Sequence, residues 1–158
     1  MSERSEALAK RFEQANGDLI ELVESLSADE WKATCKGETW PVGVTVHHIA
    51  YDQANIVQWF QSIATGQPRP PQEPGGLDAR TARHAAEHAN CTKEETLELL
   101  RRDGEMAARA VRELNDEQLD RKASDASGRT AGEVVERILI GHVLGHGASI
   151  RDAIGREV

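Results

Sequence analysis

The sequence predicts an all-α protein: a four-helix bundle in up-down-down-up order, with short accessory helices and a long proline-rich crossover. Apolar residues recur at helical spacing in several long segments, and helix-capping patterns stand at the starts of those segments. No segment alternates β-branched or aromatic residues with polar ones, as a half-buried strand would. The 158 residues suffice for one core, so we expect residues 1–158 to form a single domain.

The first half of the chain contains two long helical segments. Apolar residues follow steps of four and three between residues 8 and 26, which is typical of the buried face of a bundle helix. Residues 27–30 (SADE) have the form of a capping box, so a short helix is expected to begin at Ser27. The second long helix follows Trp40-Pro41, because proline is well tolerated in a first helical turn, and it continues to about Ala64.

A loop interrupts the pattern at residues 65–76, where four of the five prolines lie. It can carry the chain along the whole bundle, so the second and third long helices can run parallel, which favours up-down-down-up order. A polar helical piece is expected at about 79–89. A capping box at 92–95 (TKEE) begins the third long helix, residues 115–118 lead into a short helix, and a box at 130–133 (TAGE) begins the last long helix, which should end near residue 153 or 154.

Composition excludes several classes of function. The formal net charge is −8 and the pI about 5.3, so a basic surface for nucleic acid is missing. No apolar stretch has the length of a membrane span, and the polar start MSERSEALAK does not resemble a signal peptide. Cys35 and Cys91 form no metal-binding or redox spacing, so we expect free thiols in a reducing, cytoplasmic location.

The six histidines include two pairs at i, i+4 spacing, which places both rings of a pair on one helix face. His142 and His146, in ILIGHVLGHG, continue an apolar stripe and should point inward. His84 and His88 lie among charged residues and alanines, so we interpret them as part of a solvated helix face. Buried imidazoles need partners, and two readings of the inward pair stay open: hydrogen-bonded core histidines, or metal ligands.

A third histidine favours the metal. His48 comes about eight residues after the start of the second long helix, and His146 comes about eight before the end of the last one. If these helices are antiparallel neighbours, the two rings lie at similar depth, and His142 lies one turn deeper. Three converging imidazoles make an open three-histidine metal site with water in the remaining position.

Gly141, Gly145 and Gly147 each cost a helix about 1 kcal/mol relative to alanine. Beside metal ligands, Gly141 and Gly145 would make room for a neighbouring backbone, a water or a substrate. The alternative is that Gly145 and Gly147 only weaken the end of the helix.

A tryptophan-proline start, a histidine eight residues after that tryptophan in WPVGVTVHHIA, and the late HxxxH together resemble the DinB-like metal-binding superfamily. That group includes YfiT-type proteins regarded as metal-dependent hydrolases, and bacterial thiol S-transferases; mycothiol-dependent maleylpyruvate isomerases are relatives. The resemblance implies the up-down-down-up bundle, a homodimer, and a divalent metal, often zinc or nickel. The spacing from Trp40 selects His48 rather than His47, and the HxxxH supplies His142 and His146. The isomerase branch has an acidic residue where this chain has His142, a departure that weakens that particular assignment.

Two functions follow from these expectations. The first is a metal-dependent thiol S-transferase or hydrolase acting on a small molecule, with a low-molecular-weight thiol as a possible co-substrate. The second is a non-catalytic module that binds a metal or a small thiol. An open cleft reaching the metal would favour the enzyme, and a sealed site a structural ion. Asp52, one turn after His48, is interpreted as an ordinary polar residue on a helix flank rather than as an acceptor for an imidazole N–H or a proton carrier. Tyr51 and Asn55 carry no signal for a role.

Overall fold

The computed structural model describes residues 2–156, and within this range it is helical, with two isolated β-bridges and no strand. None of the helices in this range combines the length and hydropathy that crossing a bilayer requires. The elements in chain order are α1 (Glu3–Glu24), α2 (Ala28–Lys32), α3 (Val42–Ala64), α4 (Gly76–Glu87), α5 (Lys93–Arg112), α6 (Asp116–Asp120) and a last long helix built from α7 (Ala131–Glu133), the π-helical segment η1 (Val134–Ile140) and α8 (Gly141–Ile154).

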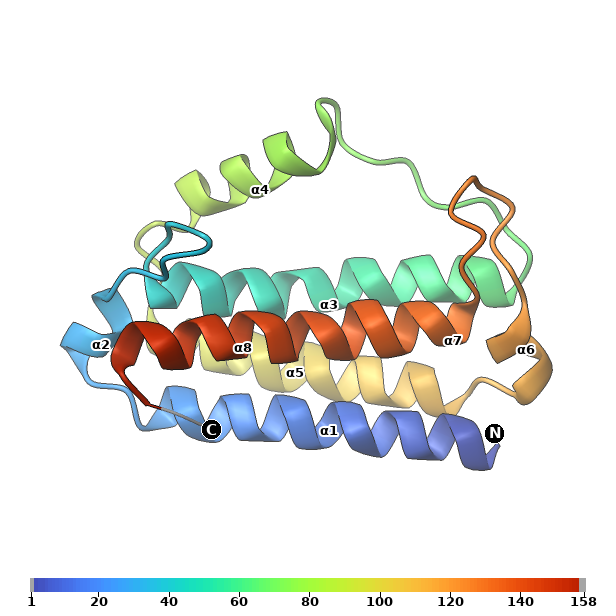
Figure 1. Ribbon diagram of the computed structural model, residues 1–158, viewed down its shortest axis with the longest axis horizontal. Coiled ribbons are helices and arrows are strands. Elements are labelled where there is room, and N and C mark those ends of the chain that lie inside the picture. Colours follow the sequence, from blue (N-terminus) through green and yellow to red (C-terminus); the bar gives the residue numbers. More distant parts are fainter. Residues whose placement is uncertain (1, 157–158) are drawn as a thin grey trace.

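Four long helices form the bundle, and their directions confirm the predicted up-down-down-up order. In Figure 1, α3 and α5 run the same way, whereas α1 and the last helix run the opposite way. Helix α5 packs against both α1 and α3, and the last helix closes the bundle against the same two helices. The chain leaves α3 at the far end and returns through the proline-rich loop and α4, which lies outside the bundle beside α3. The crossover therefore has the role that the sequence predicted.

Local hydrogen bonds explain where the helices begin and end. Capping boxes start α2 at Ser27 and α7 at Thr130, as expected from the sequence, and one also starts α6 at Asn115, where a turn into a short helix was expected. The full box expected at 92–95 does not form: the Thr92 side chain accepts from the backbone N–H of Glu95, without the return bond from Glu95. The last helix ends at Ile154, because Gly155 takes a left-handed conformation with φ 70°. Helix α4 begins at Gly76 rather than near residue 79, since two consecutive glycines with positive φ turn the chain into it.

Helix α3 is the most enclosed element of the bundle. Every residue from Val42 to Ala50 is buried, because α2, α4, α5 and the last helix all pack against α3. Large apolar side chains from the other helices complete the core. Fully buried examples are Phe12 and Leu19 of α1, Phe60 of α3, Leu100 of α5 and Leu139 of η1. Any polar group in the first turns of α3 is therefore removed from bulk water.

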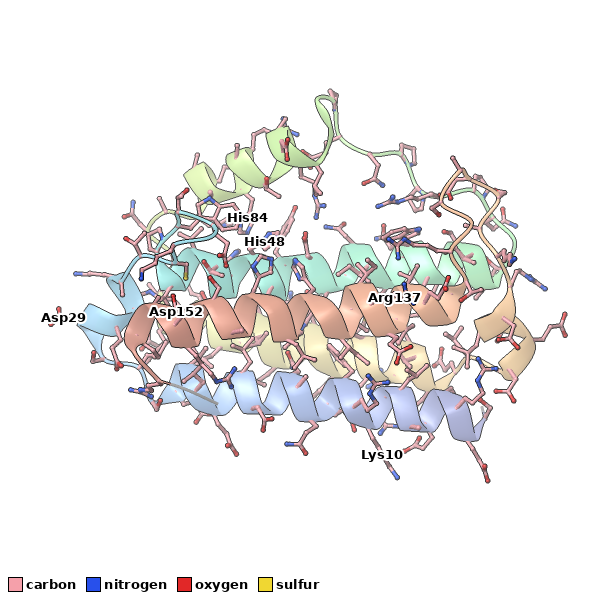
Figure 2. All side chains as sticks on the ribbon, in the orientation of Figure 1. Lys10, Asp29, His48, His84, Arg137 and Asp152 are labelled. Atoms are coloured by element: carbon pink, nitrogen blue, oxygen red, sulfur yellow. The ribbon has the colours of Figure 1, made fainter. Side chains whose placement is uncertain are left out.

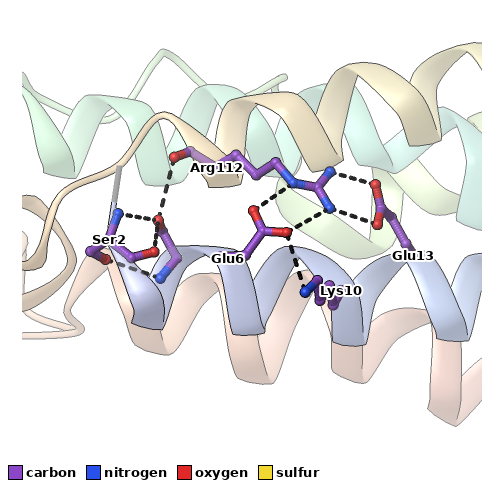
Figure 3. A network of polar contacts seen from close by, with 6 residues as sticks. Ser2, Glu6, Lys10, Glu13 and Arg112 are labelled. Carbon is purple, nitrogen blue, oxygen red and sulfur yellow. Dashed lines mark hydrogen bonds and ion pairs between the residues drawn. The ribbon is translucent and has the colours of Figure 1, made fainter.

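A polar network joins the first half of α1 to the end of α5 (Figure 3). Arg112 donates to Glu6 at 2.9 Å and to Glu13 at 2.8 Å, and these hydrogen bonds hold the pKa of both carboxyls below the usual range. Ser5, which shares a capping box with Ser2, donates its hydroxyl to the carbonyl of Arg112 at 3.3 Å. Because the ion pairs of this network lie at the surface, they contribute to the register of the two helices more than to stability.

The contact between α2 and α3 depends on Gly43. A Cβ at this position would lie 2.6 Å from Nε1 of Trp31, closer than real Cβ contacts allow. The same indole N–H donates to the carbonyl of Cys91 at 3.2 Å, which restrains the ring. We expect Gly43→Ala to lower the free energy of unfolding by about 1–3 kcal/mol, because overpacking forces the indole to move.

Gly17→Ala is the matched control. It also adds a methyl group inside a long helix, but nothing lies within 4 Å of the new Cβ, so helix propensity should raise the stability by about 0.5–1 kcal/mol. Urea unfolding of the two variants measures whether the free energy of unfolding falls in Gly43→Ala and rises in Gly17→Ala. Equal effects would show that Trp31 does not constrain Gly43.

Candidate metal centre

Three histidines meet between the first half of α3 and α8. Nε2 of His48 lies 2.9 Å from Nε2 of His142, and one ring nitrogen from each of His48, His142 and His146 falls within 4.8 Å of the others. The ring of His146 is 5.1 Å from that of His48 and 4.6 Å from that of His142, measured between centroids. The structure therefore brings together the three rings that the sequence selected. That they bind a metal stays a prediction.

A π-helical segment precedes the HxxxH pair. Residues Val134–Ile140 form the wider turns of η1, and Gly141 then begins α8 with ordinary helical geometry. Short π segments in α-helices are frequent at functional sites, because they change the direction in which the following side chains project. The sequence predicted one continuous α-helix from Thr130 past His146. Nothing in its pattern indicated a π-helical segment.

Desolvation keeps two of these imidazoles, those of His48 and His142, uncharged. Desolvation lowers the pKa of His142 to about 3, and the neighbouring His146 adds to the effect. The pKa of His48 is also lowered to about 3, chiefly by burial, although the charge of Asp52 acts in the other direction. Neutral imidazole is the form that offers a nitrogen lone pair to a metal ion. At neutral pH the cluster is therefore ready to coordinate.

Asp52 is a member of the site, and its interpretation as an ordinary residue on a helix flank was wrong. Its side chain is buried, with Oδ2 3.6 Å from Nε2 of His48 and 3.7 Å from Nε2 of His142. Its other oxygen forms an ion pair with Arg80 of α4. The one-turn spacing from His48 allowed this position, but only the approach of α4 covers the carboxylate and supplies its cation.

Glu38 is a site residue that the sequence reasoning missed. Nδ1 of His146 donates to Oε2 of Glu38 at 3.0 Å, and the hydroxyl of Ser149 donates to Oε1 at 2.6 Å. Burial acts to raise the pKa of Glu38, but the hydrogen bonds from Ser149 and His146 outweigh it and lower the pKa. The proton on Nδ1 leaves Nε2 of His146 as the nitrogen with a free lone pair. Carboxylates orient metal-binding histidines in this way in many proteins.

The loop that carries Glu38 has a strained backbone. Thr39 has φ 65°, which is rare for a β-branched residue and typical of functional positions. Backbone hydrogen bonds of 2.8 Å close the loop, from Cys35 N to Trp40 O and from Thr39 N to Cys35 O. The indole of Trp40 then meets the edge of His48, with ring centroids 5.2 Å apart. The conformation thus places Glu38 on one imidazole and Trp40 on another.

His48, His142 and His146 are called the first cluster below. An open pocket of about 440 Å³ reaches this cluster. No atom lies within 4 Å of a Cβ built at Gly145, and the nearest to one at Gly141 is 3.9 Å away, so neither glycine admits a neighbouring backbone. Both make room in the pocket, as one of the sequence interpretations expected, whereas Gly147 is buried elsewhere on α8. The lining residues are Glu38, Arg137, Ile138, Gly141, His142, Gly145 and His146.

The interpretation of His84 and His88 as a solvated face was also wrong. His84 is 6% exposed, and its Nε2 lies 2.8 Å from Nδ1 of His47; the ring of His88 stacks on His47 with centroids 4.0 Å apart. Figure 2 shows His84 of α4 next to His48 of α3. Helix α4 packs on α3 through imidazoles rather than apolar side chains. Its sequence therefore has no apolar stripe from which a buried face could be predicted. All six histidines therefore lie in two adjoining clusters.

The two cysteines are not activated nucleophiles. Both thiols are free, and burial raises the pKa of Cys35 and of Cys91. The start of α5 does not counteract burial at Cys91. Neither residue lines the pocket beside the histidines.

Comparison with known proteins agrees with this fold. Residues 11–150 match the family model of the DinB superfamily. YfiT from Bacillus subtilis, described as a probable metal-dependent hydrolase with an unusual four-helix bundle topology, superposes with a TM-score of 0.77 at 17% identity, over 99% of this chain and 91% of its own. The mycothiol-dependent maleylpyruvate isomerase gives a TM-score of 0.73 at 16% identity, over 95% of this chain and 63% of its own. At these identities the likeness shows a shared fold. No curated protein sequence matches the chain significantly.

The buried neutral imidazoles should make the metal-free protein sensitive to acid. Between an ordinary histidine pKa of 6.5 and the folded-state value of about 3 for His142, the unfolded chain binds a proton that the folded chain does not. The free energy of unfolding should therefore fall as pH decreases through this window. We expect urea unfolding after chelator treatment to show this loss between about pH 7 and about pH 5, with a shallower slope for His142→Gln. An unchanged slope in the variant would mean that His142 is not buried in its neutral form.

Proposed function

The chain belongs to the DinB superfamily, and from this premise we propose that it is a metal-dependent enzyme acting on a small molecule, as a thiol S-transferase or a hydrolase. His48, His142 and His146 hold the divalent ion. The observation that carries the proposal is the open pocket beside three clustered imidazoles, two of which, His48 and His142, have a pKa lowered to about 3 and are therefore neutral. A purely structural ion would be enclosed by protein, whereas catalytic sites keep a coordination position open.

The donor set suits zinc or nickel, which we propose as the metal. Imidazole is a good ligand for both ions, and three of them leave room for a further ligand. Nε2 of His48 and Nε2 of His142 already face each other. The hydrogen bond from Nδ1 of His146 to Glu38 leaves Nε2 of His146 directed away from that carboxylate. The chemistry of the residues present therefore fits the ion that the family implies.

A bound divalent ion supplies one property, a lower pKa for a coordinated water or thiol. The remaining work falls to the side chains of the chain. The carboxylate of Asp52, held by Arg80 and less than 4 Å from two ligand nitrogens, is placed to take the proton that the nucleophile loses. Arg137 lines the pocket, so its guanidinium is placed to meet an anionic substrate group.

A thiol nucleophile would have to come from a second small molecule, because neither cysteine lines the pocket. A low-molecular-weight thiol as co-substrate is therefore part of the proposal for the transferase, while the hydrolase needs only water. Free cysteines are usual in the reducing cytoplasm, where we place the protein. We also expect the homodimer that the family resemblance implies.

The alternative function is a module that binds a metal or a small thiol without turnover. Metal ligands alone are equally compatible with it. The favouring observation for the enzyme is that two charged side chains, Glu38 and Arg137, line the pocket beside the ligands. Screening the metal-loaded protein with thiols and electrophilic acceptors, and with esters and amides, separates the two. Metal retention without turnover of any of these would favour the binding module.

Metal content tests the site itself. We expect purified protein incubated with zinc or nickel to lose one ion per chain when His142 is replaced by alanine, because one of three ligands is removed. Elemental analysis after gel filtration measures the content. Asn55→Ala, an exposed position on the same helix as His48, is the control that should keep the full content. Equal metal content in wild type and His142→Ala would exclude this site.

The role of Glu38 makes a second test. We expect Glu38→Ala to weaken zinc binding by about 10–100-fold, because His146 loses the acceptor that orients it. Glu38→Gln should recover part of the affinity, since the amide oxygen can still accept from Nδ1. Calorimetric zinc titration measures both variants, with Glu136→Ala as an exposed control outside the pocket. Equal affinities for Glu38→Ala and Glu38→Gln would argue against an orienting hydrogen bond.

A further inference from the structure

We propose that His47, His84 and His88 form a second divalent-metal site, which binds zinc and fastens α4 to α3. The site is distinct from the one assigned to the proposed reaction and shares no ligand with it. One nitrogen from each of the three rings lies within 4.8 Å of the other two, the same limit that the first cluster meets. The inference stands even if the protein catalyses no reaction.

The ligands come from two helices in a simple arrangement. His84 and His88 are one turn apart on α4, so their rings lie on one face, with centroids 4.6 Å apart. His47 faces them from α3, with its ring centroid 5.0 Å from that of His84 and 4.0 Å from that of His88. Two ligands at i, i+4 with a third from a facing helix is a common way to build a zinc site in a helical protein.

The His47-His48 dipeptide serves both clusters because of helix geometry. Consecutive side chains project about 100° apart around an α-helix. One imidazole therefore faces α8 and the other faces α4. The rings of His48 and His84 are 5.7 Å apart between centroids, so the two clusters adjoin without merging.

The hydrogen bonding of the second cluster is incomplete without an ion. Among the described residues, its rings share one hydrogen bond, between Nδ1 of His47 and Nε2 of His84, and no carboxylate or backbone group accepts from them. Nδ1 of His84 is buried and has no partner in residues 2–156. A buried polar atom without a partner destabilises the fold, because it has lost its hydration without gaining a hydrogen bond. In the first cluster His146 has Glu38 as an acceptor, while Nδ1 of His142 is likewise buried without a partner in residues 2–156. A cation that takes lone pairs from the three rings would offset the lost hydration.

An ion here would act on α4 as a whole. His84 is the one buried residue of α4, so apolar packing does little to hold this helix on the bundle. A further tie is the ion pair between Arg80 of α4 and Asp52 of α3. Coordination by two residues of α4 and one of α3 would join the helices directly. It would also keep Arg80 on Asp52, and thereby hold that carboxylate beside the first cluster.

The experiment counts zinc ions and locates them. Full-length protein stripped with a chelator is titrated with zinc, and a parallel cobalt titration reports coordination by its visible absorption. We expect two ions per chain in wild type, and one each in His84→Gln and His142→Ala. Arg83→Gln, a neighbouring exposed change on α4, should keep both. Circular dichroism of each variant verifies that the bundle is folded.

Amide hydrogen exchange supplies the readout specific to this site. Zinc should slow exchange across α4 in wild type and in His142→Ala, but not in His84→Gln. If His142→Ala loses one ion and His84→Gln loses none, the second site is overturned and the proposed function stands. If His84→Gln loses one ion and His142→Ala loses none, the second site stands and the metal site of the proposed function is overturned. Two ions retained in His84→Gln, or zinc protection of α4 that survives this substitution, would also overturn the second site.

Discussion

The parallel course of α3 and α5 is the constraint on which the rest of the structure depends. A chain that leaves α3 at Ala64 must travel back along the whole bundle before α5 can begin at Lys93. Helix α3 has 23 residues, and at 1.5 Å per residue it spans roughly 34 Å. The proline-rich loop and α4 cover that distance on the outside of α3. Helix α4 consequently crosses the first turns of α3, where His47 and His48 lie.

This crossing encloses polar groups that an ordinary bundle would leave on its surface. Burial is the first cause of the lowered pKa of His47, His48, His84 and His142, and neighbouring imidazoles add to it in each case. Uncharged rings are easier to bury than charged ones, but their nitrogens still need partners. A cluster of neutral imidazoles is thus both a cost to the fold and a ready set of metal ligands.

The two clusters differ in what surrounds them. The first has a carboxylate on either side, Glu38 on His146 and Asp52 near His48 and His142, together with an open pocket. Carboxylates that orient ligands and accept protons are what a reaction requires. The second cluster has neither a carboxylate partner nor a place in that pocket, so an ion there suits attachment of a helix. Arg80 connects the two, because it reaches from α4 to Asp52.

The sequence by itself determined the features that depend on local interactions. Capping boxes mark helix starts, apolar spacing marks buried faces, and the proline-rich loop indicates the crossover; all of these need only neighbouring residues. The inward HxxxH pair was predictable for the same reason, whereas His48 was selected over His47 by the resemblance to the DinB-like proteins, through its distance from Trp40. Only the tertiary structure decided the environment of Asp52, the contact of Glu38 with His146, and the second cluster. Each depends on segments distant in the chain that meet through polar atoms, as α4 does, and a polar contact leaves no periodic pattern in either segment from which it could be read.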